Sequence, residues 1–453
     1  MFVQLTKTYK QLLTSSNHRT AQVKKNIVLS IFIKGFNTLT NIFLVPLTLE
    51  FVTPAEYGIW VTLSSIIGWF SFFDIGLGNG LRNKFAEAVA LGKHKLARIY
   101  ISTTYAFLIV LTTFLIVAFF IINPLLNWPE ILNCVEFSQD RLSNLVTLVF
   151  LFFCFQFLLQ LISTILTANH EPAKSSFISF LGNVIVLLSI FILSRTYTGD
   201  LLKLAFVLGL SPIVVLFISS LYLFNTNYKK YAPSLKLVQF KYTKNLMSIG
   251  VKFFIIQIAF ILLYQTNNII IIQKLGPEEV TPFNISYKYF FILPMIFNIV
   301  SLPLWSAYTD AWAKKDIIWI KNTMKKLHKL FCFIMVTVFI MIVFSDDIYT
   351  FWIGKSLKIP FLLSLNMGLY VIINIWNGIY SQFLNGVGKI KLQLIVSIIG
   401  SIINIPLAIY LCNEFGVHGT VLSTIIVSSI GAIIFPIQFK KLTNNKATGL
   451  WFK

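Results

Sequence analysis

Apolar stretches about 20 residues long recur along this 453-residue chain. Each is long enough to cross the hydrocarbon core of a bilayer as one helix. Only 12% of the residues are charged and the mean hydropathy is +0.79, whereas soluble domains carry about 25% charged residues. Connections reach roughly 20 residues at most, too few for a separate soluble domain. The sequence therefore predicts an all-α polytopic membrane protein with about 12 transmembrane helices, at 27–49, 59–80, 99–122, 142–168, 176–194, 201–224, 246–272, 283–309, 328–344, 361–386, 392–411 and 419–438.

The distribution of positive charge predicts the orientation of these spans. The net charge is +21, and with the N-terminus inside, 28 of the 37 lysines and arginines fall in inner segments while five fall in outer segments. Such a bias places both termini in the cytoplasm by the positive-inside rule. The basic loops are then expected to face anionic lipid headgroups, which makes nucleic acid an unsuitable partner.

Cysteine and histidine spacing predicts neither a metal site nor a cofactor. The four cysteines show no C-x-x-C pattern, and the five histidines are scattered over separate loops. No cleavable signal pattern precedes the first span. Residues 2–13 instead place apolar side chains at helical spacing, which is typical of a helix lying on the inner leaflet.

An internal repeat divides the chain. Pro54–Glu56 after the first span aligns with Pro277–Glu279 after the seventh, and Arg98 aligns with Lys321, both at a spacing of 223 residues. The constant spacing indicates two six-helix halves in parallel orientation, with a substrate cavity expected between them. The predicted parts are an interfacial segment 1–26, a half 27–224, a basic linker 225–245, a half 246–438 and a tail 439–453.

Charged residues inside the apolar spans are the first candidates for function, because each costs several kcal/mol when it faces lipid. Lys34 lies about eight residues into its span, roughly 12 Å deep, and Lys252 is its counterpart in the repeat. Lys288 lies nearer the outer end of its span, while Lys203 is close enough to the interface to snorkel. Asp74 is interpreted either as a charge partner or protonatable group, or as an acid that reaches water near the inner end of its span.

Neutral polar residues gather in the first, seventh and tenth spans. Some of them are expected to hydrogen-bond between helices, as in any bundle. Their clustering also suits a wet cavity that exchanges hydrogen bonds with a hydroxyl-rich cargo. The candidate cavity residues are Asn37, Asn41, Tyr264, Asn267, Asn268, Asn374 and Asn377.

The second-span region resembles a known family. The run YGIWVTLSSIIGWFSFFDIGLGNGLRNK at Tyr57–Lys84, with its continuation to Arg98, is similar to Wzx-type O-antigen and capsule flippases. These form the polysaccharide-transporter branch of the multidrug/oligosaccharidyl-lipid/polysaccharide exporter superfamily. LGPEEVTPFNISYKY at Leu275–Tyr289 and PLWSAYTDAW at Pro303–Trp312 resemble the corresponding parts of the second half. Val280-Thr281 replaces the Tyr-Gly of some relatives, a departure that leaves the resemblance intact.

The resemblance implies a MATE-like fold and a transporter rather than an enzyme. Its implied cargo is an oligosaccharide on undecaprenyl diphosphate, flipped from the cytoplasmic to the periplasmic leaflet of a bacterial inner membrane. A polysaccharide polymerase and a chain-length regulator are implied as further partners, beside the lipid bilayer. The hypothesis is alternating access with Lys34, Lys252 and Lys288 holding the diphosphate and Asp74 as coupling group or charge partner.

Two alternatives stay open at this point. A multidrug or metabolite exporter of the same superfamily that moved organic cations would need carboxylates in the membrane, and only Asp74 qualifies. A membrane glycosyltransferase or polymerase for lipid-linked sugars commonly needs an acidic cluster or a large periplasmic loop. The longest outer loop, about 123–141, carries Glu130, Glu136 and Asp140 without a paired arrangement.

Overall fold

The protein was analysed as a computed structural model, which describes residues 18–69, 77–134, 136–169, 171–197, 199–243, 266–301, 304–354 and 357–452. All regular elements within these ranges are helices. Ten of the described helical segments are long and apolar enough to cross a membrane. They lie at Phe32–Phe51, His94–Leu125, Gln139–Ala168, Pro172–Thr196, Leu201–Asn225, Pro277–Ser301, Ile317–Val343, Phe361–Val387, Lys391–Phe415 and Val417–Thr443. The predicted polytopic all-α class is therefore confirmed. The N-terminal helix predicted at 2–13, residues 70–76 of the second predicted span and residues 246–265 of the seventh lie outside the described residues.

The chain forms two compact units. The first takes its described residues from Met1–Thr53, Ile67–Pro129 and Glu136–Ile255, and the second from Pro54–Ile66, Glu130–Val135 and Ile256–Lys453. Helix α3 (Pro54–Trp69) thus contributes most of its length to the second unit, although the sequence places it in the first half.

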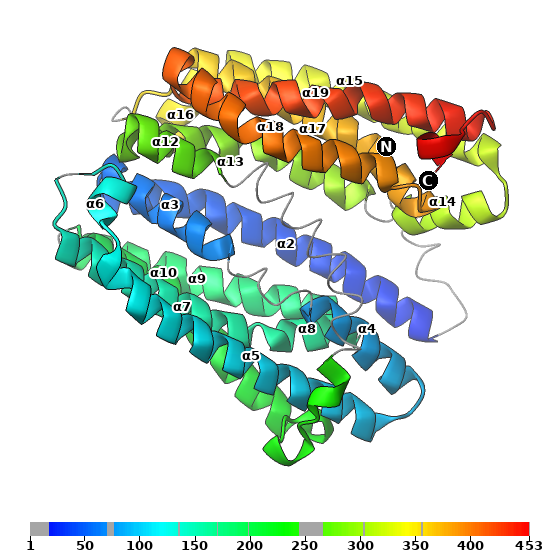
Figure 1. Ribbon diagram of the computed structural model, residues 1–453, viewed down its shortest axis with the longest axis horizontal. Helices are drawn as coiled ribbons and strands as arrows, with labels where there is room; N and C mark the ends of the chain where they lie inside the picture. The colour runs from blue at the N-terminus through cyan, green and yellow to red at the C-terminus, as the bar shows by residue number, and fades with distance from the viewer. Residues whose placement is uncertain are drawn as a thin grey trace. The chain divides into compact units, whose positions relative to one another are not determined.

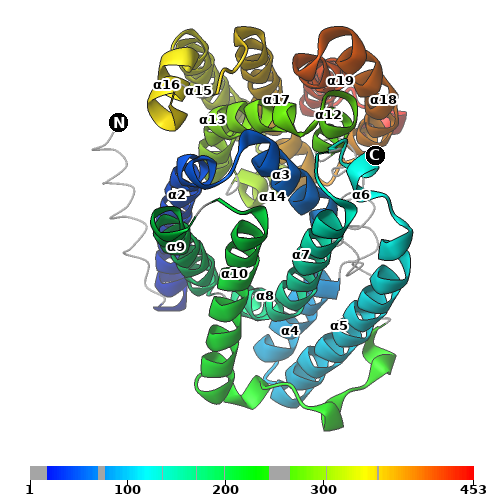
Figure 2. The same cartoon turned by 90° about the vertical axis from the view of Figure 1, so that its left-hand side faces the viewer.

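The first unit is a bundle in which α9 packs against both α2 and α10, and α10 packs against α7 (Figures 1 and 2). Its core includes Leu77, Leu81 and Phe85, which follow one another at the i, i+4 spacing of one helix face and are fully buried. The helices are α2 (His18–Phe51), α4 (Leu77–Ala90), α5 (His94–Ile122), α7 (Gln139–Leu159), α8 (Leu161–Ala168), α9 (Pro172–Thr196) and α10 (Leu201–Asn225), with the short α6 (Trp128–Ile131) and the 3-10 turn η2 (Asn123–Leu125) between α5 and α7.

The segment after α10, here called the linker strap (residues 226–243), lies along the first turns of α5. It contains the 3-10 turns η3 (Lys229–Tyr231), η4 (Leu235–Leu237) and η5 (Phe240–Tyr242). The guanidinium of Arg98 donates through Nε to the carbonyl oxygen of Ala232 at 2.8 Å, and the backbone N–H of Ser234 donates to Ser102 Oγ at 3.0 Å. These bonds fix the strap to the first unit.

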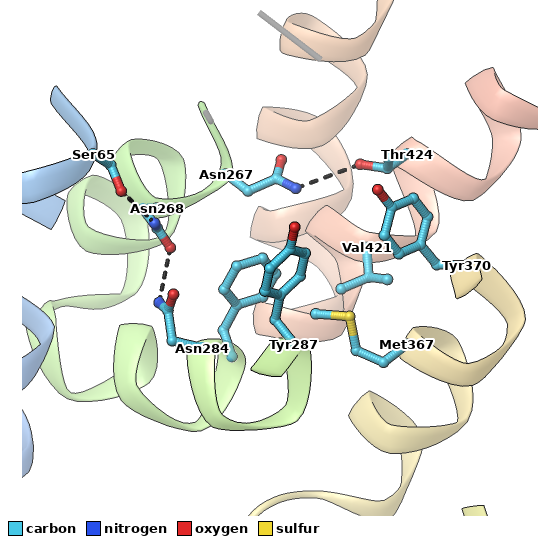
Figure 3. Close-up of a pocket in the computed structure, with 10 residues that line it drawn as sticks. Ser65, Asn267, Asn268, Asn284, Tyr287, Met367, Tyr370, Val421 and Thr424 are labelled. Atoms are coloured by element: carbon cyan, nitrogen blue, oxygen red, sulfur yellow. Dashed lines mark hydrogen bonds between the residues drawn. The ribbon is translucent and has the colours of Figure 1, made fainter. Parts of the chain in front are cut away.

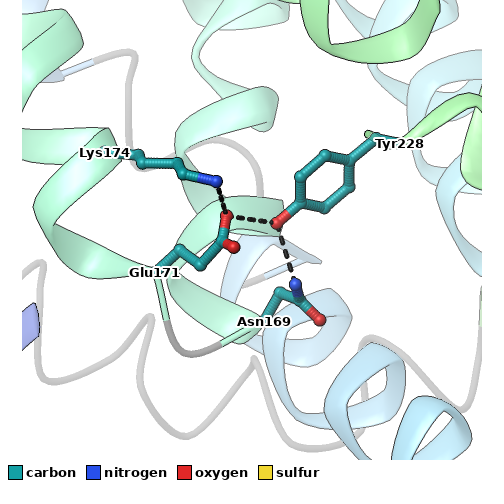
Figure 4. A network of polar contacts seen from close by, with 4 residues as sticks. All are labelled: Asn169, Glu171, Lys174 and Tyr228. Atoms are coloured by element: carbon teal, nitrogen blue, oxygen red, sulfur yellow. Dashed lines mark hydrogen bonds and ion pairs between the residues drawn. The ribbon is translucent and has the colours of Figure 1, made fainter. Parts of the chain in front are cut away.

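A polar network holds the start of the strap (Figure 4). Tyr228 donates its hydroxyl to the Glu171 carboxylate at 2.9 Å and accepts from Asn169 Nδ2 at 2.9 Å. The Lys174 ammonium lies 2.9 Å from the same carboxylate. Burial, followed by the bond to Glu171, raises the pKa of Tyr228 above its ordinary value. The phenol therefore stays protonated and remains a donor at neutral pH.

The second unit is arranged around α17, which packs against α13, α14, α15 and α19. Rings of Tyr308 and Phe383 meet edge to face at 5.4 Å where α14 meets α17. The helices are α12 (Asn267–Leu275), α13 (Pro277–Ser301), α14 (Leu304–Ala313), α15 (Ile317–Val343), α16 (Ser345–Ile353), α17 (Phe361–Val387), α18 (Lys391–Phe415) and α19 (Val417–Thr443), followed by η6 (Gly449–Phe452).

The repeat seen in the sequence reappears in helix boundaries and in turn geometry. Helices α3 and α13 begin at residues 54 and 277, and α5 and α15 begin at 94 and 317, both pairs 223 residues apart. Gly92 and Lys315, also 223 residues apart, both have positive φ values, 71° and 57°. In both turns the backbone N–H of the following residue donates to the carbonyl oxygen of an equivalent alanine. Lys93 donates to Ala88 at 2.8 Å, and Asp316 donates to Ala311 at 2.9 Å. The duplicated turn is therefore conserved between the halves in detail, although one copy lacks the glycine that such a φ favours.

Candidate functional site

A pocket of about 130 Å³ lies within the second unit (Figure 3). It is formed by α3, α12, α13, α17 and α19. The ten lining residues are Ser65, Asn267, Asn268, Phe283, Asn284, Tyr287, Met367, Tyr370, Val421 and Thr424. They combine carboxamides, hydroxyls and aromatic rings, and none of these described lining residues is Asp, Glu, Lys, Arg or His. The described part of the lining is therefore polar but uncharged.

A chain of hydrogen bonds forms one wall of the pocket. Asn268 donates from Nδ2 to Ser65 Oγ at 2.8 Å, and Asn284 donates from Nδ2 to Asn268 Oδ1 at 2.9 Å. Asn284 also donates to the Val280 carbonyl one turn earlier, and Ser65 donates to the Val61 carbonyl. These bonds tie α3, α12 and α13 together and fix the rotamers of both asparagines.

Asn267, at the start of α12, also lines the pocket, but it is less well hydrogen-bonded than Asn268. Its Nδ2 lies 3.5 Å from Thr424 Oγ1, at the limit of a hydrogen bond. Its Oδ1 is buried and has no hydrogen-bond partner within the described chain, although the residue is only 6% exposed. Within the described chain this oxygen is therefore a buried acceptor that is left unsatisfied.

Aromatic rings on α13 are stacked along one face of the helix. The Phe283 and Tyr287 rings are parallel within 18° at a centroid distance of 6.4 Å. The Tyr287 ring stacks in turn on Phe291 at 4.5 Å. The spacing of four residues places all three on one face of the helix, so the run forms a continuous ladder of rings beside the carboxamides.

A lysine lies one turn beyond the pocket on α13. The Lys288 ammonium donates to the Tyr57 hydroxyl at 2.9 Å and is half-buried, while Tyr57 is 3% exposed. In the described ranges no carboxylate lies within 4.0 Å of this ammonium, and its hydrogen-bond partner there is a neutral phenol, which does not neutralise the charge. Lys288 thus remains a net positive charge inside a predicted span.

Close contact between α3 and α13 brings Tyr57 to this lysine. A side chain on Gly58 would overlap the carbonyl oxygen of Pro277, so only glycine permits the approach. Thr281 Oγ1 donates to the Pro54 carbonyl at 2.6 Å across the same contact.

The predicted residues of the first span are on α2, in the first unit, and are not among the described residues that line this pocket. Lys34 is exposed. Asn183 of α9 donates from Nδ2 to Asn37 Oδ1 at 2.8 Å and to Asn41 Oδ1 at 3.4 Å. Asn37 and Asn41 therefore link α2 to α9, which is the interhelical bonding that the sequence left open as an alternative.

Three predicted residues, Asp74, Lys252 and Tyr264, lie outside the described residues. Asn374 and Asn377 are both half-buried on α17 and do not line the pocket. Asn377 Nδ2 donates to the Ser428 carbonyl at 2.9 Å, which joins α17 to α19.

Sequence reasoning found Asn267 and Asn268 of the pocket, and Lys288 one turn beyond it, but missed the other polar lining residues. Ser65, Asn284, Tyr287, Tyr370 and Thr424 lie in largely apolar stretches, and nothing in the sequence fixes the rotation of their helices. One signal was present: Asn284 precedes Lys288 by four residues, so the two share a helix face.

Comparison with solved structures defines the class of fold. An inward-facing multidrug resistance MATE family transporter of the MOP superfamily superposes with a TM-score of 0.73 at 13% identity, covering 93% of this chain and all of that one. An outward-facing structure of a MATE family transporter covers 96% of this chain and 98% of that one, with a TM-score of 0.63 at 14% identity. The chain therefore has the MATE fold, as the sequence predicted.

Sequence comparison then identifies the family. The chain belongs to the polysaccharide biosynthesis protein family, whose model matches residues 23–305, and the MatE family model matches residues 254–410. A candidate O-antigen transporter of Salmonella typhimurium is 23% identical over 384 residues, 82% of this chain and 85% of that protein. A candidate O-antigen export protein of Yersinia pseudotuberculosis is 22% identical, covering 80% of this chain and 82% of that protein. The resemblance drawn from Tyr57–Lys84 is confirmed, and the names of these relatives agree with transport rather than catalysis.

Proposed function

We propose that this protein moves an oligosaccharide linked to undecaprenyl diphosphate from the cytoplasmic to the periplasmic leaflet of a bacterial inner membrane. A sugar headgroup carries many hydroxyl groups, and each one left bare in hydrocarbon costs several kcal/mol. A polar protein interior removes most of that cost while the prenyl tail stays in lipid. The mechanism proposed is alternating access, in which the two halves rock so that the site opens first inward and then outward.

The observation that carries the proposal is Lys288. It is a half-buried cation inside a predicted span, and its described partner is the Tyr57 hydroxyl at 2.9 Å. A lysine paired with a carboxylate would be neutral as a pair, whereas one held by a phenol keeps its attraction for an anion. The chemical complement is the diphosphate, and an interior-negative potential favours outward movement of such an anion by about 2.3 kcal/mol per charge per 100 mV.

The remaining charged candidates belong to the same proposal. Lys34 and its repeat counterpart Lys252 are proposed to contact the diphosphate with Lys288, and Asp74 is proposed to neutralise a lysine or exchange a proton. Both termini are proposed to be cytoplasmic because of the charge bias of the loops. The flipped unit would pass to a polysaccharide polymerase and a chain-length regulator, which are proposed partners.

A second candidate is export of a small organic molecule, favoured by the MatE match over residues 254–410. An organic cation would be held best by a carboxylate in the binding pocket. The described pocket supplies carboxamides and phenols instead. Lipid-linked sugar therefore remains the better-supported cargo.

The test is substitution of Lys288 in a strain whose surface polysaccharide depends on this gene. Lys288→Met is expected to abolish most of the surface polysaccharide, while Lys288→Arg retains part of it because the charge remains. Lys203→Met is the matched control: Lys203 also lies in a predicted span, with its ammonium 4.5 Å from the centre of the Tyr197 ring, but it is exposed. Undiminished polysaccharide in the Lys288→Met strain, at equal protein abundance, would remove Lys288 from the mechanism.

A further inference from the structure

The linker strap presents different side chains to the first unit and to its surroundings. On its inward side Tyr228 and Tyr231 are 2% and 3% exposed. On its outward side Leu235 is 86% exposed and Phe240 is 56% exposed. Figure 2 shows the strap running from the end of α10 beside α5, where no regular helix forms over its length. The strap is therefore amphipathic without being one continuous helix.

Bonds to α5 fix which side of the strap faces outward. The backbone N–H of Gln239 donates to Thr103 Oγ1 at 3.1 Å. Together with the bonds of Arg98 and Ser102 to the strap, this holds three points of its backbone against one helix. The apolar side chains at residues 235 and 240 therefore stay on the outside.

The charge of the strap has one sign. Residues 226–243 contain no aspartate or glutamate, and all four lysines are exposed: Lys229, Lys230, Lys236 and Lys241. Within the described residues none of these lysines forms an ion pair with a carboxylate. Exposed apolar side chains between lysines, without acids, are typical of segments that lie on an anionic lipid surface.

The length of α5 places the strap at the depth of the lipid headgroups. Among the described residues, Thr103 is the farthest point along α5 that hydrogen-bonds to the strap. Residues 104–122, which complete the helix, are uncharged and extend about 29 Å at 1.5 Å per residue. The hydrocarbon core of a bilayer is about 30 Å thick. Because residues 104–122 are enough to cross that core, the first turns of α5 and the strap on them lie in the headgroup layer.

The second half repeats this arrangement within its own unit. Lys321, the repeat counterpart of Arg98, donates from Nζ to Asn444 Oδ1 at 2.9 Å. Asn444 directly follows α19, as the strap directly follows α10. The tail at 444–453 also contains no acid, and the Lys441 ammonium lies 4.0 Å from the centre of the Trp451 ring. Counterpart cations thus hold a basic, aromatic segment after the last helix of each half, and the membrane surface is a feature that both halves meet.

We propose that the outward side of the linker strap is a binding surface for anionic phospholipids of the leaflet at that end of α5. The four lysines contact headgroup phosphates, and Leu235 and Phe240 insert between the headgroups. The charge bias of the loops predicts only the side of the membrane on which the strap lies, whereas this surface depends on the side chains that the bonds to α5 turn outward. The surface anchors the first unit to the leaflet, whatever the cargo.

The test is backbone hydrogen exchange of residues 226–243, measured by mass spectrometry on the full-length protein in two kinds of nanodisc. One kind contains phosphatidylcholine alone, and the other an equal mixture of phosphatidylcholine and phosphatidylglycerol. The wild-type strap is expected to exchange more slowly in the mixed discs. There, Lys236→Gln combined with Lys241→Gln should speed exchange about five- to 25-fold, since each lysine near an anionic surface favours the bound state about fivefold. In phosphatidylcholine discs this variant and wild type should exchange equally.

Two further variants separate the contributions. Lys93→Gln combined with Lys95→Gln is the matched control, because both are exposed lysines at the start of α5 but outside the strap. That control must exchange like wild type in the mixed discs, where both proteins experience the same surface potential. Leu235→Ser combined with Phe240→Ser should speed exchange in both kinds of disc, because apolar insertion needs no charge on the lipid.

Other results overturn the proposal. Equal exchange of the wild-type strap in both discs, or of wild type and the lysine variant in the mixed discs, would rule out an anionic lipid surface and favour a soluble acidic partner. Faster exchange of the lysine variant in both discs alike would assign the lysines to folding of the strap instead. Unchanged exchange in the serine variant would rule out insertion of the two apolar side chains. The proposed cargo is tested separately through Lys288, so it survives each of these results.

Discussion

Asn267 and Asn268 are neighbours on α12, and the structure predicts opposite effects of replacing each with alanine. Asn268 makes two hydrogen bonds with good geometry, to Ser65 and from Asn284. Asn267 makes one contact at 3.5 Å and leaves Oδ1 without a described partner. A comparison of Asn267→Ala with Asn268→Ala therefore tests which of the two side chains is hydrogen-bonded in the pocket.

The magnitudes follow from the bonds that each substitution removes. Interhelical hydrogen bonds in membrane proteins contribute about 0.6 kcal/mol each on average. Ser65 and Asn284 keep their bonds to backbone carbonyls when Asn268 is lost, so neither is left unpaired. Asn268→Ala is therefore expected to lower the free energy of unfolding by about 1 kcal/mol, and Ser65→Ala by about half of that. Asn267→Ala removes an unsatisfied buried atom, so it should stay within about 0.5 kcal/mol of wild type or exceed it.

The measurement is the unfolding equilibrium of purified protein in mixed micelles with increasing SDS, followed by tryptophan fluorescence. The expected order of the free energies of unfolding is Asn267→Ala at or above wild type, then Ser65→Ala, then Asn268→Ala. Equal destabilisation by Asn267→Ala and Asn268→Ala would mean that the Asn267 oxygen has a partner after all.

Three further predictions concern the turns and the linker strap. Lys315→Gly should raise stability by about 1 kcal/mol because it relieves a left-handed residue, whereas Gly92→Ala in the equivalent turn should lower it by a similar amount; thermal unfolding measures both. Arg98→Ala removes the bond to the strap, so trypsin should cleave the strap faster in inverted vesicles, and an unchanged rate would show that other contacts hold it. Burial and then the bond to Glu171 raise the pKa of Tyr228. The protonated Tyr228 side chain therefore contributes fully to the free energy of unfolding below about pH 10, the ordinary pKa of tyrosine, and this contribution is lost as the pH rises further. Tyr228→Phe should make the decline in the unfolding midpoint above about pH 10 shallower than in wild type, and an equally steep decline in the variant would assign it to other groups.

Much of the fold was predictable from the sequence because hydrophobic length and charge bias are global properties. Apolar stretches predicted the spans, and the repeat aligned Pro54 with Pro277, the residues at which α3 and α13 begin. The association of α3 with the second unit was not predictable. It depends on Gly58 meeting the backbone of Pro277, a contact between residues far apart in sequence.

The site was predictable only where several signals coincided. Asn267 and Asn268 drew attention because they lie with other polar residues in one apolar span, and Lys288 because it is charged. Thr424 donates to the Thr420 carbonyl of its own helix, as many buried threonines do, and the sequence alone could not show that the same hydroxyl also faces Asn267. For Asn37 the sequence could not separate a cavity role from the bond that it makes to Asn183.

Whether the lipid-linked sugar changes leaflet is the decisive measurement. Undecaprenyl diphosphate carrying a fluorescent oligosaccharide would be reconstituted with the protein in liposomes and exposed to a membrane-impermeant quencher. Vesicles with wild-type protein should lose the protected fluorescence with time, while empty vesicles and those with Lys288→Met should keep it, and the mass of the lipid should be unchanged throughout. If wild-type vesicles retained their protected fraction, or if the lipid changed mass, transport of this cargo would be ruled out as the function.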